Sequence, residues 1–334
     1  MSRASIVECD EISELFSLIE GYTFKPYSQY PRFDCRVLSD ALFKEIQKIA
    51  ADRENHIIAV KENHRPVALC IARKSGVESD VFRKKIYAIT HLISAGSYKD
   101  SVSNKQKLLR FFTRHYMSGI GMVSCRANSE DLSTIHALEN EAYRCMDNTV
   151  TYTFDLKQLR PERKICPYRI RPVQKRDGNS LKKIVRDSQF MDRFHNDPHI
   201  PREECDRLYE TFIENAMNGI GADTVLVAEC DDKIAGFNTL ENQNCIYSAY
   251  GIKIGSFVLN AVAPEFRNRG IYSNLMNESL KYLEGCADLV EIRTHPGNFP
   301  VHRALPKIGF RLSLSQLTLH AWNTKFLSIN GDEK

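Results

Sequence analysis

A polar corner between an apolar run and an amphipathic helix carries the residues that could do chemistry. The apolar run Val258–Val262 predicts a buried strand, and apolar or small side chains recur at helical spacing over Leu275–Leu283. Between them, Arg267 and Arg269 bring positive charge to the start of the helix, and Gly270 has no Cβ to hold a ligand away. Backbone N–H groups and the helix dipole favour an anion such as a pyrophosphate there, although many basic corners of this kind are only solvated surface.

The composition favours a two-domain cytoplasmic protein. Its 334 residues, 43% hydrophobic and 26% charged, can fill two ordinary cores. Ten cysteines without a C-x-x-C pair favour free thiols in a reducing compartment. The first residues include acids where a secretory signal needs apolar side chains, and no run approaches about eighteen apolar residues, so we expect no membrane partner. The net charge of +4 is mild and scattered, so we expect no nucleic acid partner, while an anionic small molecule fits.

The chain is expected to consist of two related halves. A charged, proline-bearing segment, Leu156–Arg171, predicts a linker, and we place the boundary at residue 163, which gives domains 1–163 and 164–334. Each half has a hairpin pattern around a polar turn, at Lys61–Pro66 and at Asp231–Lys233. Each half also ends with a short helix, an aromatic bend and a strand, which indicates an old duplication, although unrelated α/β domains can share such endings. Only the second half has the basic corner, so we expect the chemistry there.

The second half resembles a known family. The sequence "VLNAVAPEFRNRGIYSNLM" resembles motif A of the GCN5-related N-acetyltransferase (GNAT) superfamily, in which a strand and an Arg/Gln-x-x-Gly-x-Gly/Ala loop bind the pyrophosphate of acetyl-CoA. The resemblance continues in the expected order over residues 168–322. It implies an α/β (α+β) fold with tandem GNAT-like domains, each a mixed, mostly antiparallel twisted sheet flanked by helices. The first domain would be degenerate, and the second would be an acetyl-CoA-dependent N-acetyltransferase.

The resemblance assigns the cofactor to the strand, the corner and the start of the last helix. The residues that it implies for acetyl-CoA binding are Leu259, Ala261, Val262, Arg267, Asn268, Arg269, Gly270, Ile271, Tyr272 and Asn298. Tyr272 departs from the family pattern, which has Gly or Ala at this position. The family geometry also implies a V-shaped opening between the strands at 254–262 and 287–294, and a closed sheet there would exclude this function.

Residues 189–219 resemble the TDP-fucosamine acetyltransferase group of surface-polysaccharide synthesis. The shared features are an Arg-Phe pair, a proline-containing loop and a helix with the pattern Tyr-x-x-Phe-Ile-Glu-Asn-Ala. This resemblance implies a small-molecule amine acceptor, a nucleotide-linked amino sugar, with Arg193, Phe194, His195 and Asn260 as acceptor-binding residues. Arg193 could form a fork on a diphosphate, and Phe194 could pack against a sugar or a base. The same loop could also be an ordinary polar connection between two helices.

The catalytic acid and base stay open. Family members often have a Tyr seven residues after the Asn that starts the last helix, and Leu305 stands there in this chain. His302, one turn earlier, could donate the proton instead, although a lone His on a helix is more often structural. Glu229, Asp197 and His195 are candidate bases, with an exposed charge beside a turn and ordinary loop residues as the alternatives.

Two other functions are compatible with the sequence. One keeps acetyl-CoA but uses a peptide, amino acid, polyamine or aminoglycoside acceptor, and the other is a non-catalytic tandem module that binds coenzyme A. For the leading interpretation we expect direct acetyl transfer in a ternary complex and no metal, and we leave open a homodimer. Residues 1–160 show no constellation of catalytic residues, so we expect the first half to be structural.

Overall fold

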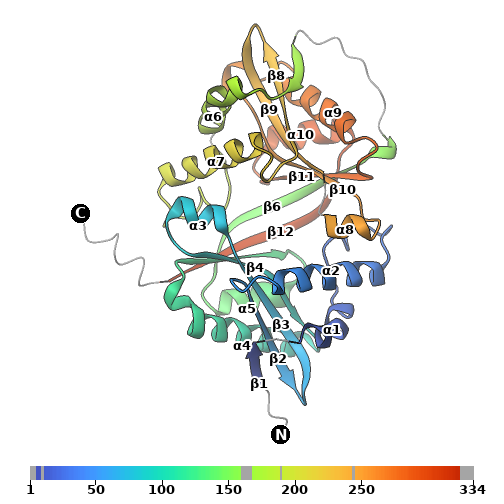
Figure 1. The fold of residues 1–334 in the computed structure, drawn as a ribbon, viewed down its shortest axis with the longest axis vertical. Coiled ribbons are helices and arrows are strands. Elements are labelled where there is room, and N and C mark those ends of the chain that lie inside the picture. Colours follow the sequence, from blue (N-terminus) through green and yellow to red (C-terminus); the bar gives the residue numbers. More distant parts are fainter. Residues whose placement is uncertain (1–4, 9–10, 159–167, 189, 243–244, 324–334) are drawn as a thin grey trace, which may run out of the picture. The chain divides into compact units, whose positions relative to one another are not determined.

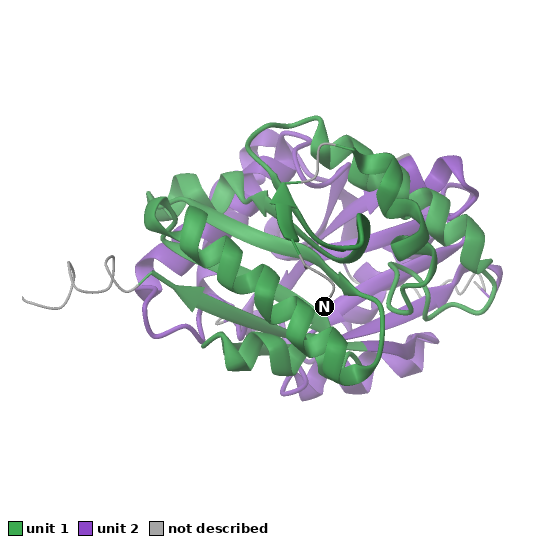
Figure 2. Ribbon diagram, turned by 90° about the horizontal axis from the view of Figure 1, so that it is seen from below, with its two compact units in different colours: residues 1–148, 315–334 green, residues 149–314 purple. Residues whose placement is uncertain are grey.

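The computed structural model describes residues 5–8, 11–158, 168–188, 190–242 and 245–323. These residues form a mixed α/β fold (Figure 1), as the sequence predicts. The chain divides into two compact units, shown in Figure 2. Unit 1 consists of Met1–Asn148 and Ser315–Lys334, and unit 2 consists of Thr149–Leu314.

Unit 1 is built on a mixed sheet with the strand order β1-β2-β3-β4-β5-β12. Strands β1 to β4 pair antiparallel, β4 and β5 pair parallel, and β12 pairs antiparallel with β5. Its elements are β1 (Ser5–Glu8), α1 (Phe16–Glu20), α2 (Cys35–Ala50), β2 (His56–Glu62), β3 (Arg65–Lys74), α3 (Gly76–Phe82), β4 (Ile86–Ser94), α4 (Tyr98–Tyr116), β5 (Met122–Asn128), α5 (Leu132–Asn140) and most of β12 (Arg311–Trp322).

Unit 2 repeats this plan with the strand order β6-β11-β10-β9-β8-β7. Strands β10 and β11 pair parallel, and the other neighbouring strands pair antiparallel. Its elements are most of β6 (Arg144–Asp155), β7 (Arg169–Pro172), α6 (Gly178–Asp187), α7 (Arg202–Met217), β8 (Thr224–Cys230), β9 (Lys233–Asn242), α8 (Cys245–Ala249), β10 (Ile254–Val262), α9 (Ile271–Leu283), β11 (Leu289–Thr294) and α10 (Phe299–Ile308).

Both hairpins that the sequence predicts are present, and they turn in the same way. Asn63 and His64 join β2 to β3 with φ of 52° and 65°, and Asp231 and Asp232 join β8 to β9 with φ of 49° and 59°. Two consecutive left-handed residues match the right-handed twist of the paired strands. Asn and Asp tolerate this conformation better than most residues, which explains why these polar dipeptides form the turns.

The units have other bounds than the expected 1–163 and 164–334. Residue 163 itself lies outside the described residues. Strand β6 precedes the expected linker, yet it pairs with β11 of unit 2 from Val150 to Asp155. Strand β12 begins in unit 2 and then pairs with β5 of unit 1 from Gln316 to Trp322. The chain therefore passes between the units twice, once within β6 and once within β12.

Helix α9 covers one face of the sheet of unit 2. A Cβ on Gly236 would lie 3.3 Å from Leu275, and a Cβ on Gly255 would lie 2.8 Å from Leu283, so both glycines face α9. The helical spacing predicted over Leu275–Leu283 is confirmed, since its apolar residues are buried. Figure 1 shows α6 and α7 on the other side of β8 and β9. No helix in the described part of the chain is long and apolar enough to cross a membrane.

Candidate active site

Strands β10 and β11 separate before either of them ends. Their parallel pairing runs only from Ile254 to Phe257 on β10, and the last partner on β11 is Ile292. Strand β10 nevertheless continues to Val262, and β11 continues to Thr294. The sheet of unit 2 is therefore open at this edge, as the sequence analysis requires.

A bulge in β10 lies where the two strands separate. The register of β10 on β9 slips between Phe257 and Asn260. The two residues between them are not buried as a core strand would be: Val258 is 52% exposed, and Leu259 is half-buried. The N–H of Leu259 donates to the Thr239 hydroxyl at 2.8 Å. The expectation of a buried strand is thus wrong at Val258, and the N–H of Leu259 already has a partner.

Two other N–H groups of β10 face the opening. The N–H of Ala263 donates to the Ala235 carbonyl on β9 at 2.9 Å. Successive N–H groups of a strand point to opposite edges, so Ala261 also points toward β9, whereas Asn260 and Val262 point away from it. The edge of β10 beyond the bulge can therefore donate hydrogen bonds to an extended ligand.

The corner after β10 leads into a helix N-terminus that no side chain caps. Gly270 is the N-cap of α9 with φ of 75°, and Asn268 also has a positive φ of 62°. A Cβ on Gly270 would meet no described atom closer than Asn274 Nδ2 at 4.0 Å, so the left-handed backbone rather than crowding favours glycine here. The first N–H groups of α9 are thus available to an anion.

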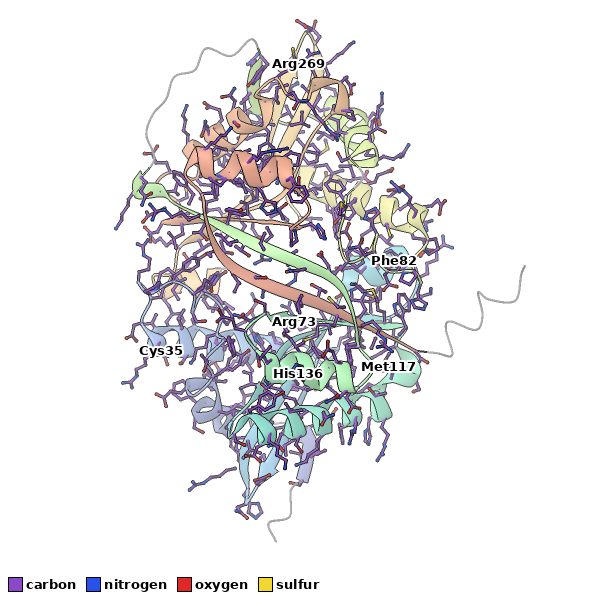
Figure 3. The ribbon with its side chains drawn as sticks, turned by 180° about the vertical axis from the view of Figure 1, so that it is seen from behind. Cys35, Arg73, Phe82, Met117, His136 and Arg269 are labelled. Atoms are coloured by element: carbon purple, nitrogen blue, oxygen red, sulfur yellow. The ribbon has the colours of Figure 1, made fainter. Side chains whose placement is uncertain are left out.

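Two arginines flank this helix end. Arg267 is exposed, and its Nε donates to the Val262 carbonyl at 3.2 Å. The guanidinium carbon of Arg269 lies 5.4 Å from the centre of the Phe266 ring, and Figure 3 labels Arg269 among the side chains of unit 2. Both cations add to the positive potential of the helix N-terminus.

Tyr272, which departs from the family pattern, turns into the core. Its side chain packs against the core of unit 2, and its hydroxyl is buried without a hydrogen-bond partner among the described residues. Burial raises the pKa of this phenol. The ring therefore leaves the outer side of the first helical turn clear.

Helix α10 also begins without a side-chain cap. Asn298 is its N-cap, and its side-chain amide donates instead to the Thr294 hydroxyl at 3.1 Å. Leu305, where the family often has a Tyr, is fully buried in the core of unit 2. The usual acid position is therefore part of the hydrophobic core.

His302 lies one turn into α10 with both ring nitrogens engaged. Its Nε2 is 3.1 Å from the His295 carbonyl, which can only accept, so Nε2 carries the proton. The Tyr152 hydroxyl lies 2.9 Å from Nδ1 and donates to it in this neutral tautomer. Sequence analysis missed Tyr152 because β6 was assigned to the first half. The only available signal was the strand-like pattern around it.

Glu229 lies away from the opening. Its carboxylate accepts from Arg171 Nε at 2.8 Å, and Arg171 also pairs with Asp177 at 2.7 Å. The hydrogen bond from Arg171 lowers the pKa of Glu229. Glu229 pairs in register with Ile234, beyond the residue of β9 that bonds Ala263. The structure thus separates Glu229 from the bulge and makes it a weak base.

The loop before α7 holds its polar residues in internal contacts. Asp197 is 2% exposed and accepts from the backbone N–H of His199 at 3.0 Å. His195 bonds Asp192 through Nδ1 and lies 3.5 Å from Asp206 through Nε2. Burial lowers the pKa of His195, but the hydrogen bonds and charges of the two aspartates outweigh it and raise the pKa. These contacts stabilise the conformation of the loop.

The expected acceptor aromatic is also internal. Phe194 is 4% exposed, and the guanidinium carbon of Arg193 lies 4.4 Å from the centre of its ring. Phe194 therefore presents no open face to a sugar. The loop still borders the start of α10, because the Met191 methyl lies 3.4 Å from the position of a Cβ on Gly297.

Unit 1 repeats the open strand pair. Strand β4 pairs parallel with β5 only from Ile86 to Ile89, although β4 continues to Ser94. The register of β4 on β3 slips beside Ile71 and Ala72, as it does in β10. The strand geometry of the second unit is thus preserved in the first.

The helix ends in unit 1 are occupied by its own side chains. Ser97 and Asp100 form a capping box on α4, and Asp131 caps α5 by accepting from the Thr134 N–H at 3.0 Å. Lys105 of α4 is 2% exposed and reaches Asp131 at 3.2 Å. A buried ion pair and carboxylates therefore lie where unit 2 offers unpaired N–H groups.

Comparisons with known proteins agree with this geometry. Residues 188–310 match the sequence model of the acetyltransferase (GNAT) family. The chain is 23% identical over 271 residues to the spore coat polysaccharide biosynthesis protein SpsD of Bacillus subtilis (strain 168), covering 79% of this chain and 87% of that protein.

Three solved structures share the fold. A GCN5-related N-acetyltransferase from Sphaerobacter thermophilus superposes with a TM-score of 0.62 at 12% identity, covering 96% of this chain and 95% of that one. A tandem GNAT protein from the clavulanic acid biosynthesis pathway has a TM-score of 0.57 at 11% identity, covering 96% and 98%. A GCN5-related glucosamine N-acetyltransferase region of a fungal multi-domain β-N-acetylglucosaminidase has a TM-score of 0.63 at 12% identity, covering 96% and 38%. The chain therefore has a tandem GNAT-like fold, and residues 188–310 of its second unit match the acetyltransferase (GNAT) family, a match that supports an acyltransferase.

Proposed function

We propose that unit 2 binds acetyl-CoA across the corner 267–272 and the open edge of β10, and that it acetylates the amine of a nucleotide-linked amino sugar. The observation that carries this proposal is an uncapped, arginine-flanked helix N-terminus beside a strand edge with outward N–H groups. The helix end suits a pyrophosphate, and the strand edge suits the amide and carbonyl groups of a pantetheine arm.

Each part of the site has a separate task. Gly270 and the first turn of α9 would hold the pyrophosphate, with Arg267 and Arg269 adding charge. The N–H groups of Asn260 and Val262 would align the arm and polarise the acyl oxygen. Bound acetyl-CoA supplies an acyl carbon activated as a thioester.

His302 is the proposed donor of the proton to the leaving sulfur, directly or through water, in its imidazolium form, because the neutral tautomer keeps its one N–H proton on the His295 carbonyl. Its ring is oriented by Tyr152 and by the His295 carbonyl. Neither Glu229 nor Asp197 is proposed as the base, because each is held by the contacts described above.

The acceptor class rests on three observations. The relative SpsD is named for spore coat polysaccharide synthesis, and one structural relative contains a glucosamine N-acetyltransferase region. The loop before α7 reaches the start of α10, so it can border the acceptor. We place the reaction in the cytoplasm, since Cys35 and Cys145 are exposed and unbridged.

Calorimetric titration with acetyl-CoA tests the cofactor site. The wild type is expected to bind one acetyl-CoA, and the double variant Arg269→Glu with Gly270→Asp is expected to lose binding, because it puts negative charge at the helix N-terminus. Lys183→Glu, an exposed charge reversal on α6, is the matched control and should bind like the wild type.

Thiol release then tests the acceptor. TDP- and UDP-linked amino sugars are compared with free glucosamine, an amino acid and spermidine. Preference for a linked sugar supports the proposal, whereas preference for one of the others reassigns the acceptor. Absence of acetyl-CoA binding by the wild type would overturn the proposed function and favour a non-enzymatic module.

A further inference from the structure

The sheet face of unit 2 that points away from α9 carries a polar row next to the opening. Ser256 pairs with Glu241 on β9 and with Glu291 on β11. Side chains alternate along a strand, and Gly255 faces α9, so Ser256 and its two partners face the opposite side. A glutamate therefore lies on each side of Ser256.

The same face is accessible at the point where the strands separate. Val258 and Arg293 lie two residues beyond Ser256 and Glu291 on that face. Val258 is 52% exposed, and the Arg293 side chain is also 52% exposed. Glu241 is exposed as well, so a solute can reach all three side chains.

The charges on this face have unequal roles. The Glu291 side chain is only 6% exposed and lies 3.7 Å from Arg293 Nη2, so it helps to position the arginine. Glu241 accepts no hydrogen bond from any other residue within the described ranges. Partial desolvation and the charge of Asp223 raise the pKa of Glu241, while Arg293 acts in the opposite direction. The Glu241 carboxylate is thus available to bind a cationic group of a ligand.

The position of this face suits the second reactant. The corner and α9 lie on one side of the sheet, and they are assigned to the cofactor. A nucleophile must reach the acyl carbon from a different direction, and the face away from α9 meets the opening directly at Val258. Glu241 and Arg293 lie on either side of this approach.

We infer that this face binds the acceptor, with Glu241 holding the ammonium group and taking its proton while Arg293 binds an anionic group of the same molecule. Two strand spacings and a two-residue offset separate the Cα atoms of Glu241 and Arg293 by about 12 Å. Long side chains can converge from that distance on an amine and a phosphate joined by one sugar ring. This inference rests on the proposed function and names the residues that would hold the amine and the anionic group of its acceptor.

The proton balance is complete without another reactant. The ammonium gives one proton to Glu241, which passes it to solvent, and the neutral nitrogen forms the C–N bond as the C–S bond breaks. The nitrogen then loses a second proton, and the thiolate gains one, so the products are an amide, a thiol and one released proton.

Kinetics with a matched pair of acceptors test the inference. The probes are a TDP-linked 4-amino-4,6-dideoxyhexose and the methyl glycoside of the same amino sugar. Glu241→Gln is expected to lower kcat/KM about 100-fold for both probes, because a positioned base is lost. Arg293→Gln is expected to raise KM about tenfold for the TDP-linked probe only. Glu278→Gln, an exposed acid on α9, should change neither value more than about twofold.

Binding measurements separate this inference from the proposed function. The affinity for acetyl-CoA should be the same in all three variants as in the wild type. If the wild type does not bind acetyl-CoA, that result bears on the cofactor site and not on the acceptor face. If no amine is acetylated, ligand-observed NMR with the TDP-linked probe decides. Binding that Glu241→Gln and Arg293→Gln abolish supports the face, and no binding overturns it. Equal behaviour of Glu241→Gln and Glu278→Gln, or an equal effect of Arg293→Gln on both probes, also overturns it.

Discussion

Replacing Lys105 by Met tests how strongly the buried ion pair between α4 and the N-terminus of α5 stabilises unit 1. The Lys105 ammonium lies 3.2 and 3.3 Å from the two carboxylate oxygens of Asp131. It also donates to the hydroxyls of Ser133 and Thr134 at 2.7 Å each. The Lys105 side chain is 2% exposed, so methionine leaves a buried carboxylate without its counter-charge.

The size of the effect follows from what Asp131 keeps. Removing one partner of a buried pair costs about 3–5 kcal/mol. Asp131 still accepts from the Thr134 N–H at 3.0 Å and from the hydroxyls of Ser133 and Thr134 at 2.7 and 2.6 Å. Since these bonds stabilise the remaining charge, we expect Lys105→Met to lower the free energy of unfolding of unit 1 by about 3 kcal/mol. Adding Asp131→Asn removes the charge and keeps a residue that caps helices well, so we expect it to restore about 2 kcal/mol.

The single tryptophan reports on the unit concerned. Trp322 lies in the part of β12 that pairs with β5, and Lys84 Nζ lies 5.4 Å from its ring. Urea unfolding followed by tryptophan fluorescence therefore measures unit 1. Lys99→Met, at an exposed position on the same helix, should stay within about 0.5 kcal/mol of the wild type. If Lys105→Met lowers the free energy of unfolding by less than about 1 kcal/mol, or if the double variant recovers none of it, the Lys105–Asp131 pair is not an important stabilising contact of unit 1.

Three further predictions concern unit 2. Gly236→Ala places a Cβ 2.8 Å from the Ala261 carbonyl, so we expect a loss of about 1–3 kcal/mol in urea unfolding and weaker acetyl-CoA binding by calorimetry. Gly270→Ala meets no close atom, so we expect only the backbone strain of about 1–2 kcal/mol and a small loss of affinity in the same assays. Burial raises the pKa of Asp177, but the hydrogen bonds from Arg171 and the backbone outweigh it and lower the pKa. The ionised Asp177 therefore stabilises the folded state fully at a pH above the pKa of an unfolded aspartate, and this stabilisation is lost as the pH falls through the lower pKa of the folded state. Arg171→Met should therefore cost about 3–5 kcal/mol at pH 7, and its gap from the wild type should narrow as urea unfolding is repeated below about pH 4.

Local patterns predict local structure well in this chain. The two hairpins follow from alternating apolar residues around polar dipeptides, and α9 follows from the spacing of its apolar face. The unit bounds do not follow, because the alternation in β6 and β12 shows that each is a strand but not which sheet it joins. That choice depends on partners such as Val150 with Thr294, which lie far apart in the sequence.

The same distinction applies to the candidate site. The corner could be found because its glycine and arginines act through their own backbone and the adjoining helix. Residue type and position, near a strand end and in a polar loop, make Glu229 and Asp197 candidate bases, and the structure shows each in a contact that the sequence cannot reveal. The partner of the Leu259 N–H is equally hidden, because the bulge depends on how β9 and β10 slip in register.

The two units show that capping and ligand binding compete for the same backbone groups. Both keep a slipped strand and a short parallel pair, so strand geometry alone does not distinguish them. In unit 1 the N-termini of α4 and α5 are satisfied by the Ser97–Asp100 capping box and by Asp131, which stabilises each helix by about 1 kcal/mol and puts a carboxylate where an anion would bind. In unit 2 the N-caps Gly270 and Asn298 provide no side-chain hydrogen bond to their helices. Unit 2 forgoes that stabilisation, and a pyrophosphate bound there would supply it, so acetyl-CoA should raise the unfolding temperature of unit 2 and leave the tryptophan signal of unit 1 unchanged.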